Sequence, residues 1–177
     1  MGCDIHLCRE RKVNGIWETS TTERIEQYGE DEDEVYTSIS NGIEDFEITP
    51  PRYVGRSYTL FSFLSNVRSY DDKKWFVDPI AEDRGFPEDI CEIHKKLLDD
   101  EDLHSPGYVT MQELLDLITA TKEELLKASI GASSHSTEEL DHLLIRLTKL
   151  VETVNWDNYF EGLDPQSECR ILICYDN

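Results

Sequence analysis

The stretch that decides the fold is residues 3–19, Cys-Asp-Ile-His-Leu-Cys-Arg-Glu-Arg-Lys-Val-Asn-Gly-Ile-Trp-Glu-Thr. Its first half alternates, as a β-strand does, so that successive side chains fall on two faces. Cys3, Ile5 and Leu7 share one face, and the other carries Asp4, His6, Cys8 and Glu10. Asn14-Gly15 is typical of a two-residue type I′ turn. These residues predict a β-hairpin with one polar face.

The other end of the chain predicts the partner of this hairpin. Residues 169–175, Cys-Arg-Ile-Leu-Ile-Cys-Tyr, form an apolar, β-rich run that ends in Asp176-Asn177. The simplest packing pairs this terminal strand with the N-terminal hairpin. We therefore expect an α+β fold, in which a small, mainly antiparallel sheet has helices inserted between its first and last strands.

The intervening chain indicates four helices and two short strands. Apolar spacing predicts a helix near 58–67 that Arg68 would close, and Pro87 at a favoured first position predicts another over 87–98. Two capping boxes, Thr110-x-x-Glu113 and Ser136-x-x-Glu139, predict helices over 110–128 and 136–154. We expect these two to form a helical hairpin over 110–155, and residues 1–177 to be one domain. Short strands are expected around 35–39 and 46–48.

The charge balance limits the partners. Lys and Arg number 17 against 38 Asp and Glu, for a formal net charge of −21. An acidic field disfavours direct binding to nucleic acid or to an anionic membrane. The run 30–34 is wholly acidic and is expected to form an exposed loop. A strongly acidic surface is also a means of imitating nucleic acid, so an acidic inhibitor of a nucleic-acid enzyme is one functional hypothesis.

The sequence points to the cytosol. No window is apolar enough for a membrane span, and the first residues lack the features of a signal peptide. The five cysteines, an odd number, contain no Cys-x-x-Cys pair and are expected to be reduced, mostly buried thiols. We therefore expect a cytoplasmic protein, located in the host cytosol if a phage encodes it. A homo-oligomer is left open.

The candidate site residues lie in short, separate segments. Asp4 and His6 share a strand face, and Asp176 would approach them if the terminal strands pair. His104 and Ser105 are expected in a loop before a capped helix, where ligand-binding residues are common. Arg56 and Arg84, each placed before the start of a helix, are cations that could receive an anion, whereas Arg68 at a helix end is explained by a structural role. His94 and His142 are expected on helices, as packing or surface residues.

Several of these segments also match motifs of a known group of proteins. They include the opening Met1-Gly-Cys-Asp-Ile-His6, the motif Arg84-Gly-x-Pro-x-Asp89, and the closing Asp176-Asn177. Arg56-x-Tyr-x-Leu-Phe-x-x-Leu-x-x-Val-Arg68 and Asp102-x-His-Ser105 complete the match. The chain resembles small, mostly uncharacterised proteins encoded by bacteriophages and by bacterial genomes that carry prophages. The resemblance implies that polar residues of these segments act as one set, which consists of Asp4, His6, Arg56, Arg68, Arg84, Asp89, His104, Ser105 and Asp176.

Two further functional hypotheses follow. In the leading one, the protein binds a small anionic ligand, a nucleotide or nucleotide-derived signal, and sequesters it to counter host defence, with no cofactor required. In the other, Asp4, His6, His104 and Asp176 hold a divalent metal ion that activates water, and the protein hydrolyses a small phosphorylated or nucleotide substrate. Whether the ligand is cleaved or only bound stays open, and so does whether the protein is an enzyme.

Overall fold

The computed structural model describes residues 5–19, 21–23, 37–38, 46–48, 57–68, 75–98, 101–155 and 158–176. Its elements follow one another along the chain as β1 (Ile5–Val13), β2 (Ile16–Thr19), β3 (Thr21–Glu23), β4 (Thr37–Ser38), β5 (Phe46–Ile48), α1 (Tyr58–Ser65), α2 (Glu92–Leu97), β6 (His104–Thr110), α3 (Met111–Ser129), α4 (Thr137–Val154) and β7 (Cys169–Tyr175). The backbone of β3, β4 and β5 forms a small sheet of its own, in the order β3-β5-β4. The acidic run 30–34 lies outside the described residues.

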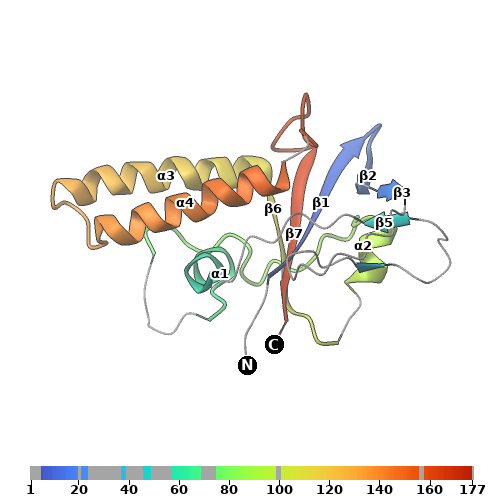
Figure 1. Cartoon of the computed structure of the whole chain (residues 1–177), viewed down its shortest axis with the longest axis horizontal. Coiled ribbons are helices and arrows are strands. Elements are labelled where there is room, and N and C mark those ends of the chain that lie inside the picture. The colour runs from blue at the N-terminus through green and yellow to red at the C-terminus, as the bar shows by residue number, and fades with distance from the viewer. Residues whose placement is uncertain are drawn as a thin grey trace, which may run out of the picture.

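The main sheet is the predicted one, with an additional strand. Its order is β2-β1-β7-β6, and all neighbours are antiparallel. Strand β7 therefore lies between the N-terminal hairpin and β6, as Figure 1 shows. Tyr175 pairs with Ile5 on one side and with His104 on the other. The expected α+β fold, with the terminal strands paired, is confirmed.

The hairpin turn has the backbone that its sequence predicts. Asn14 and Gly15 have φ angles of 52° and 82°, the left-handed conformation that both central residues of a type I′ turn adopt. Asparagine and glycine tolerate this conformation better than other residues. The turn sets the register, so Val13 faces Ile16 and Lys12 faces Trp17.

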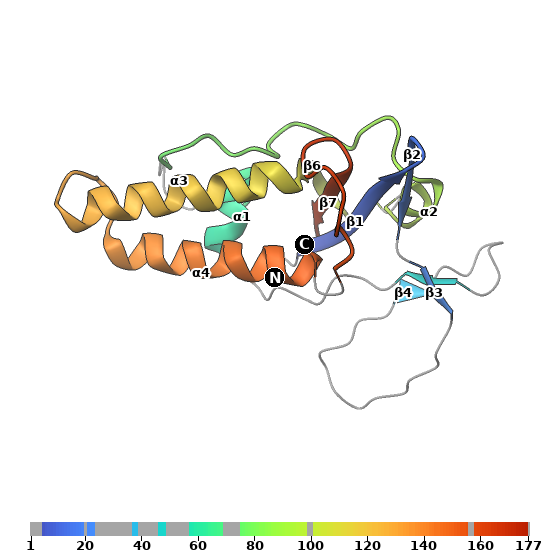
Figure 2. The same ribbon diagram turned by 90° about the horizontal axis from the view of Figure 1, so that it is seen from above.

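The helical hairpin meets one face of the sheet at one end and extends away from the strands (Figures 1 and 2). Helices α3 and α4 run side by side in Figures 1 and 2, and each begins at its predicted capping box, where Thr110 and Ser136 are the cap residues. The core lies between this hairpin, α1 and the odd-numbered residues of β1 and β7. Its members include Ile5, Leu7, Phe61, Leu64, Leu114, Leu143, Leu147, Leu150, Ile171, Ile173 and Tyr175. Within the described residues, no helix combines the length and apolar character needed to cross a membrane.

The helix predicted over 87–98 is wrong in its first half, because α2 begins only at Glu92. The polar groups of the preceding backbone are used elsewhere. The Asp89 carbonyl accepts a hydrogen bond from Arg170, and the Cys91 N–H donates to Glu10. Pro87 therefore lies in a turn before the helix and does not start it.

Two smaller boundaries also differ from the expectation. Helix α1 ends at Ser65 because Asn66 adopts a left-handed conformation, so Arg68 lies beyond the helix and does not close it. His104 and Ser105 belong to strand β6, and not to a loop, because His104 pairs with Tyr175 ahead of an irregularity that ends at Gly107. Pro106 lies within this irregularity, where its missing N–H removes no regular ladder bond.

Candidate functional site

The two ends of the main sheet bring His6 and Asp176 together. The His6 Nε2 atom lies 3.1 Å from Oδ2 of Asp176, and both side chains are partly exposed. This contact agrees with the prediction that Asp176 approaches His6. Asp4 and Arg56, two further predicted site residues, lie outside the described residues.

His104 lies on the opposite face of the sheet from this pair. Its ring stacks on that of Tyr175 at 6.0 Å, and Tyr175 belongs to the core face with Ile5. His6 pairs with Cys174, so its side chain and that of Asp176 project from the other face. The described members of the predicted metal set, His6, His104 and Asp176, therefore do not converge on one ion.

A cavity of about 620 Å³ does bring three predicted ligand residues together. Arg68, His104 and Ser105 line it, although Arg68 lies in the turn after α1 and the other two belong to β6. Two carboxylates, Glu82 and Asp83, line it as well. Within the described part of the chain, the Arg68 guanidinium has no ion-pair partner. The cavity lining therefore places a cation beside two carboxylates and other hydrogen-bonding groups.

The backbone around this cavity is unusual. Six non-glycine residues of the described chain have a positive φ, and four of them line the cavity: Asn66, Arg68, Asp83 and Ser105. Their φ angles lie between 49° and 56°, a conformation that asparagine and aspartate tolerate but that costs Arg68 and Ser105 of the order of 1–3 kcal/mol each. Such residues gather at ligand clamps, where the surrounding structure holds them in place.

The wall of the cavity opposite α1 is held by a close backbone contact. A Cβ atom on Gly107 would lie 2.6 Å from the carbonyl oxygen of Ala81, so only glycine lets the two segments approach this far. Ala81 in turn donates its N–H to the carbonyl of Leu64, and Gly85 donates to that of Pro106. Residues 81–85 are thereby fixed between α1 and β6.

Arg84, predicted to bind the ligand, is already paired. Its guanidinium donates to both carboxylate oxygens of Glu113, at 2.9 and 3.0 Å, and to the carbonyl of Tyr108 at 2.9 Å. Burial opposes ionisation of Glu113, but the hydrogen bonds from Arg84 and from the Thr110 N–H outweigh it and lower the pKa of Glu113. Arg84 thus ties the 81–85 segment to the start of α3 and does not line the cavity.

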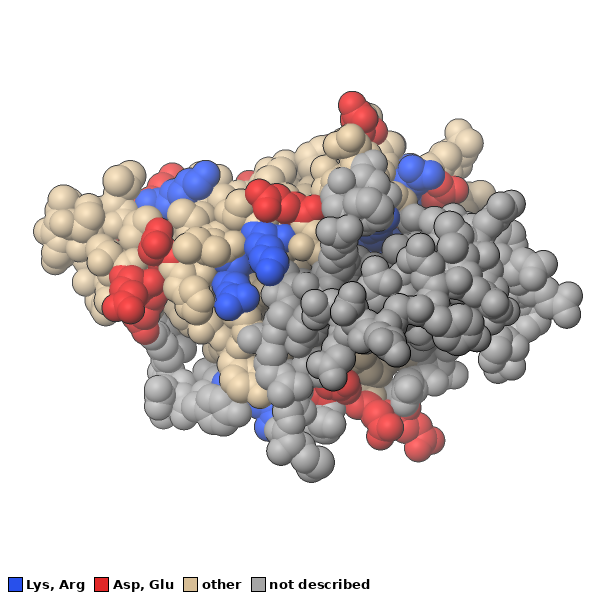
Figure 3. All heavy atoms as spheres, in the orientation of Figure 1, with Lys and Arg blue, Asp and Glu red and all other residues tan. Residues whose placement is uncertain are grey.

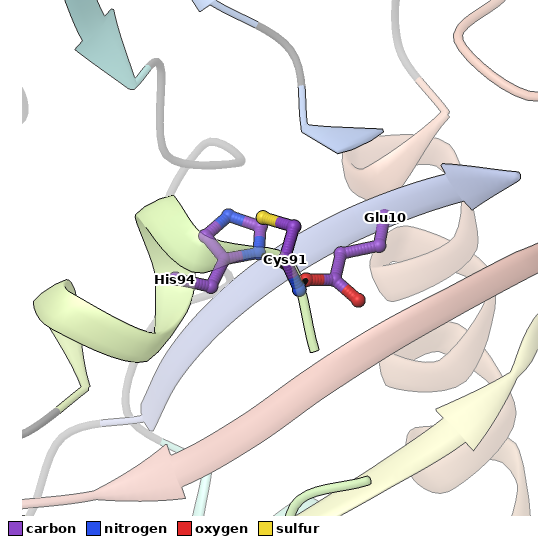
Figure 4. A group of neighbouring side chains, drawn as sticks. All are labelled: Glu10, Cys91 and His94. Atoms are coloured by element: carbon purple, nitrogen blue, oxygen red, sulfur yellow. Dashed lines mark hydrogen bonds and ion pairs between the residues drawn. The ribbon is translucent and has the colours of Figure 1, made fainter. Parts of the chain in front are cut away.

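A second polar cluster lies beneath α2, on the face of the sheet away from the helical hairpin. Glu10 of β1 and His94 of α2 are fully buried, and Oε1 of Glu10 lies 2.8 Å from Nδ1 of His94. Cys91 stands just before α2, and its N–H donates to the same oxygen at 2.9 Å. Figure 4 shows the three side chains converging. One donor atom of each lies within 4.8 Å of the other two.

Arg170 and Asp89 complete the cluster. The buried Arg170 donates to Oε2 of Glu10 at 2.7 Å and to Oδ1 of Asp89 at 2.6 Å. Its guanidinium also lies over the ring of Trp17, 3.8 Å from the centroid, and Trp17 donates to Asp89. This sharing compensates for the removal of the Arg170 and Glu10 charges from water.

Neighbouring groups and burial shift the pKa values of Glu10 and Cys91 in this cluster. Burial alone would raise the pKa of Glu10, but hydrogen bonds from His94 and the Cys91 N–H, together with the Arg170 charge, lower it below its ordinary value. Burial raises the pKa of the Cys91 thiol to about 12. At neutral pH the cluster therefore holds a carboxylate and a protonated thiol.

Sequence reasoning missed this cluster. It placed Glu10 on a polar strand face and His94 among packing residues, and it looked only for Cys-x-x-Cys pairs. The signal that could have found it is the spacing Cys91-x-x-His94 at the start of a helix, which places a thiol and an imidazole one turn apart. That Glu10 lies opposite this pair could not be read from the chain, because 81 residues separate Glu10 from Cys91.

No family model matches the chain, and no curated protein or solved structure shows significant similarity to it.

Proposed function

We propose that the protein binds a small ligand with an anionic group, of the nucleotide class, in the cavity lined by Arg68, His104 and Ser105. The observation that carries this proposal is the gathering of strained backbone and predicted ligand residues around one cavity of about 620 Å³. Ligand pockets in proteins typically enclose roughly 300–1,000 Å³. A cavity of this size accommodates a mononucleotide.

The chemistry of the lining supports this class of ligand. The Arg68 guanidinium suits a phosphate, which it can bind through two parallel hydrogen bonds. The carboxylates of Glu82 and Asp83 only accept hydrogen bonds, so they suit the hydroxyl or amino groups of the same ligand and repel a second phosphate beside them. A molecule with one anionic end and several hydrogen-bond donors satisfies both requirements.

The resemblance to phage and prophage proteins supports a role in countering the defence of a host cell. A cytoplasmic phage protein that sequesters a signalling nucleotide would weaken a host defence that depends on it. Imitation of nucleic acid by an acidic surface receives less support. On the face drawn in Figure 3, the described Lys and Arg side chains lie beside Asp and Glu and do not leave a uniform acidic surface.

A binding experiment with matched arginine variants tests the proposal. The full chain is incubated with a panel of mono-, di- and cyclic nucleotides, and affinity is measured by calorimetry. Arg68→Ala removes a charge-assisted hydrogen bond worth about 1.5–3 kcal/mol, so it should weaken binding about 10- to 100-fold. Arg146→Ala, on α4 and outside the cavity, is the control and should leave affinity unchanged.

The fate of the ligand separates binding from catalysis. After incubation the protein is denatured by heat, and the released ligand is identified by mass spectrometry. Intact ligand supports sequestration, whereas cleaved ligand shows that the protein is a hydrolase. If no member of the panel binds, or if Arg68→Ala and Arg146→Ala have equal effects, the cavity is not the nucleotide site.

A further inference from the structure

The cluster beneath α2 contains three kinds of metal donor. A thiol, an imidazole and a carboxylate come from Cys91, His94 and Glu10, and one donor atom of each lies within 4.8 Å of the others. Thiolate and imidazole together favour Zn²⁺ over Mg²⁺ or Ca²⁺, which prefer oxygen ligands. The donor chemistry thus selects one class of ion.

The hydrogen bonds of the cluster leave His94 only partly satisfied. One nitrogen of its ring lies against Glu10, but the other, Nε2, is buried and has no hydrogen-bond partner within the described part of the chain. The nitrogen that faces Glu10 is Nδ1, so Nδ1 is the atom that would bind an ion shared with Glu10, in place of the hydrogen bond between the two side chains.

The surroundings are arranged as in a metal site. Arg170 holds Oε2 of Glu10 and leaves Oε1 directed at Cys91 and His94. Residues behind the ligands commonly orient a ligating carboxylate in this way. Tetrahedral zinc bonds of about 2.0–2.2 Å would place the oxygen and nitrogen ligands about 3.3 Å apart, so the 2.8 Å contact between Glu10 and His94 needs to widen by only about half an ångström.

The charges also balance. A zinc ion bound by the Glu10 carboxylate and the Cys91 thiolate is neutral overall, and the Arg170 guanidinium remains paired with Asp89. Zinc displaces the proton of the thiol, which leaves to solvent as the Zn–S bond forms. Exchange of the thiol proton for Zn²⁺ adds one positive charge, so Glu10 and Cys91 with the ion change from a net charge of −1 to neutral.

We propose that Glu10, Cys91 and His94 bind one zinc ion that ties the start of α2 to strand β1. Three protein donors leave a fourth position for a water molecule. The site is independent of the proposed ligand cavity, because it lies on the other face of the sheet and shares no residue with it.

Metal analysis of designed variants tests this site. The full chain is purified without a histidine tag, stripped with a chelator, reloaded with Zn²⁺, dialysed, and its zinc content is measured. We expect one zinc per chain in the wild type, and less than a tenth of that in Cys91→Ser and His94→Gln. Cys169→Ser and His142→Gln, which alter a thiol and an imidazole outside the cluster, are matched controls and should retain the ion.

Two results would overturn the proposal. One is a wild-type chain that retains no zinc after dialysis. The other is a zinc content in Cys91→Ser and His94→Gln that equals the zinc content of the wild type. Arg68→Ala should still bind zinc, so failure of this proposal and failure of the ligand cavity are distinguished.

A second measurement covers the case in which His94→Gln does not fold. Among the described thiols, those of Cys8, Cys169 and Cys174 are buried, and Cys91 is partly exposed. Cobalt loading of the wild type should produce a thiolate-to-cobalt charge-transfer band, and zinc should protect Cys91 from alkylation until a chelator is added. A cobalt spectrum without that band, or alkylation of Cys91 at the same rate with and without zinc, would refute Cys91 as a ligand.

Discussion

Replacing Gly107 with alanine should lower the free energy of unfolding by about 1–3 kcal/mol, the usual cost of forcing an extra methyl group into a packed site. The new Cβ would meet the carbonyl oxygen of Ala81 at 2.6 Å and its Cβ at 3.0 Å. The carbonyl belongs to backbone that cannot move freely, because Ala81 is buried and its N–H donates to Leu64 at 2.9 Å.

The sign of this effect makes the experiment decisive. Without the contact to Ala81, alanine would stabilise a strand position by about 0.5–1 kcal/mol over glycine, because glycine loses more conformational freedom on folding. In a chain of this length, a loss of 1–3 kcal/mol should lower Tm by about 2–12 °C. The alanine variant should therefore melt below the wild type, and not above it.

Two assays check the result. Calorimetry measures the change in Tm, and hydrogen exchange should show faster exchange of the Ala81 amide, while amides in α3 and α4 keep their protection. A Gly107→Ala variant as stable as the wild type, or more stable, would show that the 81–85 segment does not lie against β6. It would also remove the support for the cavity wall.

Further predictions concern the core, one ion pair and one cap. Leu147→Ala, in the fully buried core, should cost about 2–5 kcal/mol in urea unfolding, whereas Ile145→Ala, at a position 56% exposed on the same helix, should change stability by no more than about 0.5 kcal/mol. The pKa of Glu113 is lowered by Arg84, so the stability from this pair is present above the ordinary glutamate pKa of about 4.3 and is lost as the pH falls through the lower, folded value. Glu113→Gln should thus be less stable than the wild type at pH 7, and a difference that persists unchanged in titrations down to about pH 2 would contradict this account. Ser136→Ala should cost about 1 kcal/mol, because Ser136 accepts the Glu139 N–H at the start of α4; unchanged thermal unfolding would show that the cap contributes nothing.

Local signals account for the parts of the fold that were predicted correctly. The Asn14-Gly15 turn and the capping boxes at Thr110 and Ser136 act over two to four residues, so their chemistry is visible in the chain itself. The apolar run 169–175 could belong to only one kind of element, and its pairing with the hairpin followed from the small number of strands available. The late start of α2 was not predictable, because the Arg170 and Glu10 partners that hold residues 89–91 lie far away in sequence.

The candidate site, like the fold, was predictable from the sequence only in part. The types of residue were visible in the sequence, and His6 with Asp176 meet because the end strands pair. Which residues share a cavity was not visible. Arg84 carries the same charge as Arg68, but its guanidinium is paired with Glu113. Because 29 residues separate Arg84 from Glu113, this pairing could not be read from the sequence.

The order of residues along the chain therefore establishes the hairpin, the terminal strand, the two capped helices and the alternation of side chains on β1, since these depend on near neighbours. Folding in three dimensions established which face of β1 is covered. Helix α2 buries Glu10, which the strand pattern alone assigns to a polar face, and places it against Cys91 and His94. The physical reason is that burial and charge pairing are properties of whichever distant segment packs on a face, and that segment is selected by the free energy of the whole fold.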